Sequence, residues 1–115
     1  MKSKIEQKLD AEFEKRGVIP HIYHFTGENV EPYRAITVAL KEPQRYEVVQ
    51  DGVIGLVGRS LCRHPRYRVA FLLRYMHGMA GIAICNRRDN FDRRKGRVIA
   101  KGRLLKHLKE DNKER

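Results

Sequence analysis

Apolar residues near the N-terminus recur every four positions. Ile5, Leu9 and Phe13 stand at this spacing among charged and polar neighbours. Side chains four residues apart lie on one face of a helix, so the pattern predicts a short amphipathic helix. Gly17 follows as its expected end, because glycine readily adopts the backbone conformation found just past a helix, and Pro20 then breaks the chain.

Three apolar stretches further along the chain have the composition of strands. Residues 21–25 and 35–40 are rich in aromatic or β-branched side chains, and residues 81–85 form the continuous apolar run of a buried strand. Residues 68–76 alternate weakly and fit either a strand or a helix. We therefore expect several short strands in the middle of the chain.

A further pair of strands is predicted around positions 51 and 52. Asp51-Gly52 stands between the apolar runs 46–49 and 53–57, and an Asp-Gly pair in this setting is the strongest short-range signal for a β-hairpin. The glycines of this stretch superficially resemble a phosphate-binding loop, but they lack the spacing of that motif. We interpret the stretch as a glycine-tolerant strand or bulge.

The longest helical pattern runs from Phe91 to about Leu108, after Asp89 or Asn90 as the predicted N-cap. At about 100° per residue, one narrow stripe and its flanks form the predicted core face. This face consists of Phe91, Val98, Ile99, Gly102, Leu105 and Leu108. Glycine inside a helix costs about 1 kcal/mol relative to alanine, so Gly102 indicates that another backbone approaches the helix there.

Two other faces of this helix carry candidate chemistry. One is a purely basic stripe at i, i+4 and i+8, made of Arg93, Arg97 and Lys101. The other combines Gly96, Ala100 and Arg103. We expect the two small residues of the second face to leave room beside Arg103 for a ligand or a neighbouring subunit.

Together the elements predict an α+β fold, with a small antiparallel sheet and an N-terminal helix and a long C-terminal helix packed on one face. A chain of 115 residues suits one hydrophobic core. We expect residues 1–110 to form a single domain and residues 111–115 to form a charged, flexible tail.

Membrane and secreted classes do not fit the sequence. The longest apolar stretch, residues 69–85, is interrupted by Arg74 and His77 and is shorter than a membrane span needs. The N-terminus is charged where a signal peptide is apolar. The two cysteines, Cys62 and Cys85, form no CxxC pair. We expect a cytoplasmic protein with reduced cysteines, and one disulfide between them is the alternative.

The net charge is strongly positive and unevenly distributed. The chain has 25 Lys and Arg against 14 Asp and Glu, a formal net charge of +11. Residues 52–88 contain arginines but no acid, and a planar guanidinium forks two hydrogen bonds onto a phosphate. Such a charge predicts a polyanionic partner, namely a nucleic acid, a nucleotide, phosphate or an anionic membrane. The alternative is a solvated surface that keeps a small protein soluble.

The segment between the last predicted strand and the last helix is a candidate anion site. Backbone N–H groups and the positive end of the helix converge at such a junction. Asn86, just past the strand, either reads a base edge or ribose hydroxyl through its amide or merely turns the chain. Upstream, Tyr67, Phe71 and Tyr75 alternate with arginines. We expect Phe71 in the core. For Tyr67 and Tyr75 two interpretations stay open, a place at the sheet edge or stacking on a base.

Catalytic motifs are incomplete. His24 begins a His-x-Thr triplet that resembles half of a two-histidine phosphoesterase signature, but neither His64 nor His77 supplies the other half. The cysteines lack neighbours at zinc-ligand spacing, and the arginine-rich middle of the chain holds no carboxylate for a metal-dependent nuclease. We therefore expect a protein that is not an enzyme and needs no metal or cofactor, with histidines in packing or surface roles.

Residues 85–104 resemble a pattern found in short proteins of phages and mobile elements. In that pattern a strand ending in Cys is followed by D-x-F and then by R-x-x-G-R-x-I-A-x-G-R, which here begin at Asp89 and Arg93. Arg87 stands where the pattern would have Pro. The named family that the chain resembles is the first phage Thoeris anti-defence family, whose members are similar in length and in having a sheet with a C-terminal helix.

This resemblance implies a non-enzymatic sponge. Proteins of that family bind cyclic nucleotide signals of bacterial immune systems, including glycocyclic ADP-ribose, and sequester them without cleavage at the subunit boundaries of homo-oligomers. On the matching residues, Asn86 would contact the base or ribose, and Arg97 and Arg103 would hold phosphates. The protein would then be phage-encoded and act in the cytoplasm of the host cell.

The leading hypothesis from the sequence is a protein that captures glycocyclic ADP-ribose or a cyclic oligonucleotide in a basic pocket at a subunit boundary. The predicted ligand-binding residues are Asn86, Arg93, Arg97, Lys101, Arg103 and Tyr75. A basic protein that binds nucleic acid or inhibits a ribonucleoprotein is the alternative. An inhibitor that recognises an acidic protein surface is a third interpretation.

Overall fold

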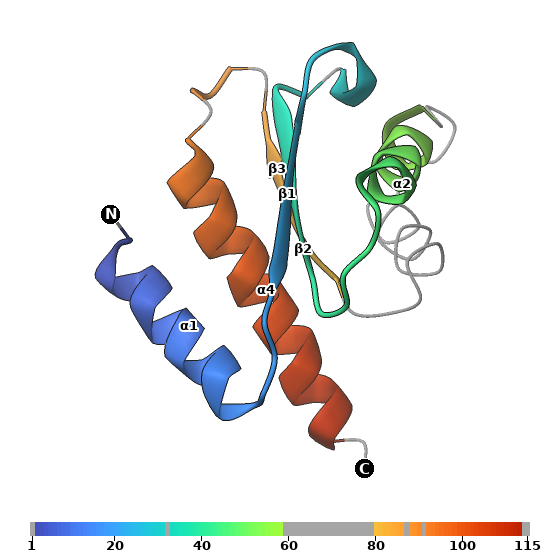
Figure 1. Ribbon diagram of the computed structural model, residues 1–115. Coiled ribbons are helices and arrows are strands. Elements are labelled where there is room, and N and C mark those ends of the chain that lie inside the picture. Colours follow the sequence, from blue (N-terminus) through green and yellow to red (C-terminus); the bar gives the residue numbers. More distant parts are fainter. Residues whose placement is uncertain (1, 32, 59–79, 87, 91, 114–115) are drawn as a thin grey trace.

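The chain folds into a small sheet with helices packed on it (Figure 1). The structure is a computed structural model that describes residues 2–31, 33–58, 80–86, 88–90 and 92–113. The elements in chain order are α1 (Lys4–Lys15), β1 (His21–Thr26), the 3-10 helix η1 (Glu28–Val30), β2 (Ala35–Leu40), α2 (Tyr46–Gly58), β3 (Ala80–Cys85) and α4 (Arg93–Lys113). The element predicted over residues 68–76 lies outside the described residues.

The three strands form one antiparallel sheet with β2 in the centre. Helices α1 and α4 pack side by side on one face of this sheet, and η1 and α2 cover the other (Figure 1). Every residue of β2 is buried because this strand has a neighbour on each side and helices on both faces. The predicted α+β architecture is confirmed, including the placement of the N-terminal and C-terminal helices on one face.

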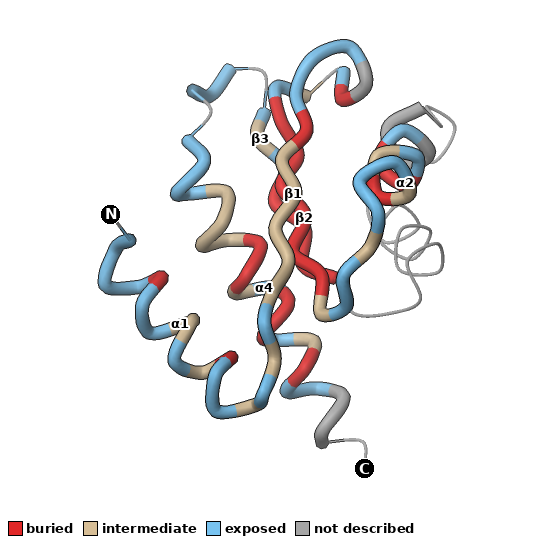
Figure 2. Tube along the Cα trace, in the orientation of Figure 1, coloured by how far each residue is buried: buried red, intermediate tan, exposed pale blue. Residues whose placement is uncertain are grey.

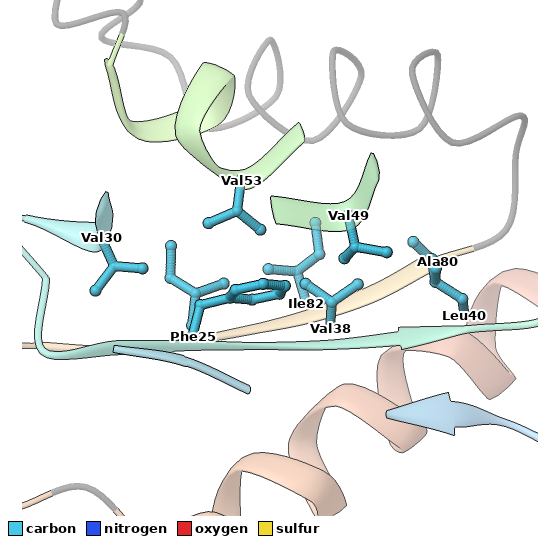
Figure 3. Close-up of a cluster of buried hydrophobic side chains, with 9 residues drawn as sticks. Phe25, Val30, Val38, Leu40, Val49, Val53, Ala80 and Ile82 are labelled. Carbon is cyan, nitrogen blue, oxygen red and sulfur yellow. The ribbon is translucent and has the colours of Figure 1, made fainter. Parts of the chain in front are cut away.

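Residues 46–58 form a helix, so the hairpin predicted around Asp51-Gly52 is wrong. Val49 and Val53 are fully buried on the side of α2 that meets the sheet (Figure 3). Tyr46, three residues before Val49, packs on the sheet as well, with its ring centroid 5.2 Å from that of Phe25. Residues three apart share a face in a helix but not in a strand, so burial on one face outweighs the local turn signal.

Branched apolar side chains fill the space between the sheet and α2. The buried members are Phe25, Val30, Ile36, Val38, Leu40, Val49, Val53, Ala80 and Ile82 (Figure 3). Burying each large side chain of this type contributes about 1.5–3 kcal/mol. Helix α2 is therefore held by hydrophobic packing with residues from all three strands.

The layer between the sheet and the terminal helices combines small and large apolar residues. Its buried members are Phe13, Ala39, Ala83, Ala100, Leu104, Leu105 and Leu108. A Cβ atom added at Gly81 would lie 2.5 Å from the backbone nitrogen of Leu104 and would also collide with the carbonyl oxygen of Ala100. The backbones of strand β3 and helix α4 are thus in close contact at Gly81.

The prediction that another backbone approaches α4 at Gly102 is wrong, because a Cβ atom there would meet nothing within 4 Å. Leu105 and Leu108 of the predicted core face are buried, and Ala100, Lys101 and Leu104 are buried although they were not predicted (Figure 2). The helix packs against both the sheet and α1, and part of its contact with α1 is ionic, so apolar residues alone do not mark its buried side. Phe91, also part of the predicted stripe, lies outside the described residues.

Helix α1 ends where the sequence predicted. Its N-cap is Ser3, whose Oγ accepts a hydrogen bond from the backbone N–H of Glu6 at 3.2 Å. Gly17 follows the helix with φ of 67°, the left-handed conformation that glycine adopts without strain. The helix and its end signal therefore agree with the structure, but Ile5 of the predicted apolar face is 63% exposed and Glu6 is buried.

Helix α4 begins later than predicted. Asp92 caps it in place of Asp89 or Asn90, because its Oδ1 accepts a hydrogen bond from the backbone N–H of Arg94 at 2.9 Å. The carboxylate of Asp92 lies at the positive end of the helix, where a negative charge is stabilising. The helix continues to Lys113, past its predicted end.

Candidate functional site

A pocket of about 210 Å³ lies between the sheet and the N-terminal half of α4. Its lining comes from β2, from β3, from the junction before α4 and from α4 itself. The lining residues are Thr37, Ala83, Ile84, Cys85, Asp89, Asn90, Asp92, Lys95, Gly96 and Ile99. Small side chains on both walls, at positions 83 and 96, leave this space. Helix α4 is exposed over residues 93–95 and half-buried over 96–99, and its first buried residues are Ala100 and Lys101 (Figure 2).

The most deeply buried polar group of the pocket is the hydroxyl of Thr37. This residue is 1% exposed and stands between His24 and Ala83 in the register of the sheet. Its Oγ1 lies 2.9 Å from Nδ1 of His24, and the direction of this hydrogen bond depends on the tautomer of the ring. The sequence predicted a packing or surface role for the histidines, and His24 is half-buried on the face of the sheet that carries α4.

The charge state of His24 is set by its surroundings. Burial lowers the pKa of its imidazole below the ordinary value of 6.5, and the positive charges of Arg93 and Arg97 lower it further. The ring is therefore neutral at pH 7. Two of the predicted ligand residues, Arg93 and Arg97, thus come close enough to a single histidine to act on its charge.

Three cations, Arg93, Arg94 and Lys95, occupy the first turn of α4, and all three are exposed. Cations near this end of a helix are disfavoured by about 0.3–1 kcal/mol each, because the backbone N–H groups already make it positive. The cap Asp92 offsets only part of this charge. The three cations of this turn would attract an anion, whereas the carboxylates of Asp89 and Asp92 in the pocket lining oppose one.

The other two members of the basic stripe, Arg97 and Lys101, are paired with carboxylates of α1. Glu6, with only 1% of its side chain exposed, accepts hydrogen bonds from Arg97 Nε at 3.0 Å and from Lys101 Nζ at 2.9 Å. Lys101 also donates to Asp10 at 2.8 Å. Burial alone would raise the pKa of the Glu6 carboxyl, but the two cations outweigh it and lower this pKa. These ion pairs hold α1 against α4.

Arg103 donates a hydrogen bond from its guanidinium to the backbone carbonyl oxygen of Ile82 in β3. Ala100, predicted beside it on an open face, is fully buried where Gly81 approaches α4. Gly96 lines the pocket instead. The expected room beside Arg103 is therefore absent at Ala100, and Arg103 does not line the pocket.

The junction between β3 and α4 folds as a turn. The backbone N–H of Asp89 donates to the carbonyl oxygen of Asn86 at 3.0 Å, and the thiol of Cys85 lies 3.6 Å from the same oxygen. The side chain of Asn86 is exposed and does not line the pocket. Tyr75 and Tyr67, the predicted stacking residues, lie outside the described residues.

Sequence reasoning missed the carboxylates that pair with the basic stripe. Glu6 and Asp10 stand four residues apart, which is also the spacing of Arg97 and Lys101. Opposite charges at matched helical spacing are a signal for two helices packed face to face. Thr37 carried no comparable signal, because its place in the pocket depends on the strand register and on where α4 lies.

Within the described part of the chain, no helix is long and apolar enough to cross a membrane. No three His, Cys, Asp or Glu side chains among the same residues gather where they could hold a metal ion. Comparisons of the chain with protein-family models, with curated proteins and with solved structures gave no match. The chemistry of the pocket is therefore interpreted from its own residues.

Proposed function

We propose that this protein captures a small anionic nucleotide, without changing it chemically, in the pocket between the sheet and the N-terminal half of α4. The proposal rests on the first turn of this helix, where Arg93, Arg94 and Lys95 add positive charge to an end that is already positive. Lys95 also lines the pocket. A phosphate at this position would gain charge-assisted hydrogen bonds, which are roughly twice as strong as neutral ones.

The phosphate-binding role in this proposal differs from the one expected from the sequence. Arg97 and Lys101 are occupied by Glu6, and Arg103 is occupied by a backbone carbonyl of β3. Contact with the phosphate therefore falls to Lys95, and Arg93, which does not line the pocket, would add its positive charge nearby. Apolar parts of the lining, such as Ala83 and Ile99, offer a surface for a sugar or base.

The size of the pocket supports a site shared between two copies of the chain. Ligand pockets typically measure about 300–1,000 Å³, and this one measures about 210 Å³. A cyclic nucleotide would extend beyond the rim, where a second subunit would cover it. Such a homo-oligomer fits the resemblance of residues 85–104 to the phage Thoeris anti-defence family. The protein would then be a phage sponge for glycocyclic ADP-ribose or a cyclic oligonucleotide, acting in the host cytoplasm.

Thermal-shift and calorimetric titrations with glycocyclic ADP-ribose, cyclic dinucleotides and cyclic trinucleotides test this proposal. A ligand present at 100 times its dissociation constant stabilises the fold by about 2.7 kcal/mol, so its melting temperature rises. We expect Lys95→Ala to weaken binding by about tenfold or more, because one charge-assisted hydrogen bond is lost. Lys106→Ala, which changes an exposed lysine further along α4, is the matched control and should bind as the parent protein does.

Two outcomes of these titrations would contradict the proposal. The first is the absence of any stabilisation or heat with every nucleotide of the panel. The second is an equal loss of affinity in Lys95→Ala and Lys106→Ala, which would indicate general charge attraction rather than a site. Recovery of the unaltered ligand after the complex is heated would distinguish capture from cleavage.

A further inference from the structure

The pocket contains one buried hydroxyl with a titratable partner behind it. Thr37 is 1% exposed and lines the pocket, and its Oγ1 is within 2.9 Å of Nδ1 of His24. These two residues are paired across β1 and β2 on the face of the sheet that α4 covers. The Thr37 side chain can therefore contact a ligand in the pocket and a titratable imidazole at the same time.

The protonation of His24 decides what the Thr37 hydroxyl offers to the pocket. When Nδ1 carries no proton, the hydroxyl can donate to the ring and turn its lone pairs toward the pocket, which suits a ligand donor. When Nδ1 carries a proton, the ring donates to Oγ1, and the hydroxyl proton is released toward the pocket, which suits an anion. A protonated imidazole always has this proton, whereas a neutral one has it in only one tautomer.

The charges around His24 make its protonation depend on whether an anion is bound. Arg93 and Arg97 of α4 both act on the ring, and Arg97 is itself paired with Glu6 of α1. In the empty site these positive charges oppose a further positive charge on the imidazole. An anion held by Lys95 in the pocket, against the carboxylates Asp89 and Asp92 that also line it, would cancel part of their field and thereby favour the imidazolium ion.

We propose that the His24–Thr37 pair makes anion capture proton-linked: His24 takes up a proton from water when the anion binds, and Thr37, accepting a hydrogen bond from the ring, donates its own proton to the anion. This inference rests on the proposed function, because it uses the same pocket. It adds the class of ligand group at the pocket floor, a phosphate or sulfate oxygen, and assigns Thr37 as the residue that contacts it. His24 is a positioning residue that acts through Thr37.

The sign of the pH dependence follows from the two states of the site. The empty site holds the pKa of His24 below 6.5, and the occupied site holds it higher. At a pH well above the higher pKa, binding of the anion therefore involves no proton. At a pH between the two pKa values, binding takes up one proton. Affinity for a non-titrating anion should increase by up to tenfold for each pH unit descended within this window, and should level off below the lower value.

Nuclear magnetic resonance of the histidine ring tests the inference without knowledge of the natural ligand. The probe is sulfate, which stays fully ionised over the titration range of His24. We expect sulfate to raise the pKa of His24 more than sodium chloride does at matched ionic strength, because chloride only screens the two arginines. In Thr37→Val, which keeps the shape but removes the hydroxyl, the difference between sulfate and chloride should shrink, because the hydrogen bonds through the hydroxyl are lost while the charge of the anion remains. Thr37→Ser should restore the difference.

Equal effects of sulfate and chloride in the parent protein would overturn the inference, and so would a sulfate effect that is undiminished in Thr37→Val. His21→Asn serves as the control for replacing a histidine, because position 21 alternates with His24 to the opposite face of β1. We expect it to leave the response of His24 intact.

The result can be separated from that of the nucleotide titrations. If a nucleotide binds but does so with the same affinity to the parent, Thr37→Val and His24→Asn at every pH, the pocket captures nucleotides and the proton linkage is wrong. If no nucleotide binds but sulfate raises the pKa of His24 through Thr37, the anion site stands and the proposed ligand class is wrong.

Discussion

At the scale of single residues, substitution of Glu6 should have a clear effect on stability, because its side chain is almost entirely buried among ion pairs. It accepts hydrogen bonds from Arg97 and Lys101, and Lys101 reaches Asp10 as well. Moving a carboxylate out of water costs several kcal/mol, which these partners offset. Removal of the Glu6 charge would leave two cations at the α1–α4 contact with Asp10 as the remaining carboxylate of the network.

Glu6→Gln is expected to lower the free energy of unfolding by about 3 kcal/mol, the lower end for a broken buried ion pair. Urea denaturation followed by circular dichroism measures this loss. Glu14→Gln is the control, because Glu14 is exposed on the same helix, and its effect should be within about 0.5 kcal/mol. A similar loss in both variants would show that the helix, rather than the ion pairs, had been weakened.

The same ion pairs give the protein a defined acid dependence. Folding lowers the pKa of Glu6 from 4.5 and that of Asp10 from 3.8, because cations of the network outweigh the effect of burial. Their contribution to stability is complete above these ordinary values and is lost as the pH falls through the lower values of the folded protein. Glu6→Gln should therefore show a shallower loss of stability in acid than the parent, and an unchanged profile would contradict this account.

At the scale of elements, regular apolar periodicity predicted the helices and strands correctly, whereas a competing local turn signal did not. Helix α1, strands β1, β2 and β3, and most of α4 were predicted because each has a consistent apolar pattern or a clear boundary. Helix α2 was missed because its Asp-Gly pair indicates a turn, whereas its burial against the sheet can be judged only once the sheet exists. Helix α2 is thus a case in which tertiary packing overrides local preference.

The candidate site could be predicted only in part for a related reason. Cations on α4 were visible in the sequence, and Arg93 does lie at the pocket end of the helix. Their partners were not, because Glu6 is separated from Arg97 by 91 positions along the chain. A basic stripe therefore indicated charge but could not distinguish cations engaged in packing from cations facing a ligand.

Gly81 and Gly102 should respond in opposite ways to substitution by alanine. Gly81→Ala is expected to destabilise the protein by about 1–3 kcal/mol, because the added methyl group collides with the backbone of α4. Gly102→Ala is expected to stabilise it by about 0.5–1 kcal/mol, because the helix interior favours alanine and nothing lies within 4 Å. Thermal denaturation of both variants checks the direction of each stability change. A loss of stability in Gly102→Ala would support the close backbone approach that the sequence predicted.

At the scale of the whole molecule, the net charge of +11 separates two classes of partner. A nucleic acid that contacts Z phosphates loses affinity with a slope of roughly −0.7Z to −0.9Z against the logarithm of salt concentration. A small nucleotide held in one pocket makes few such contacts, so we expect a shallow slope for it. Binding measured at two salt concentrations, for a cyclic dinucleotide and for single-stranded and duplex DNA, checks this expectation. Tight, steeply salt-dependent binding of DNA alone would favour the nucleic-acid alternative.

The contact between α1 and α4 also bears on how the chain is made. Ribosomes release the N-terminal end first, at about 5–20 residues per second, so Glu6 emerges well before the cations that neutralise it. Until residues 97 and 101 have been synthesised, α1 has no partner that can take its carboxylate out of water. The nascent helix must remain hydrated during that interval, and its docking must be among the last events of maturation.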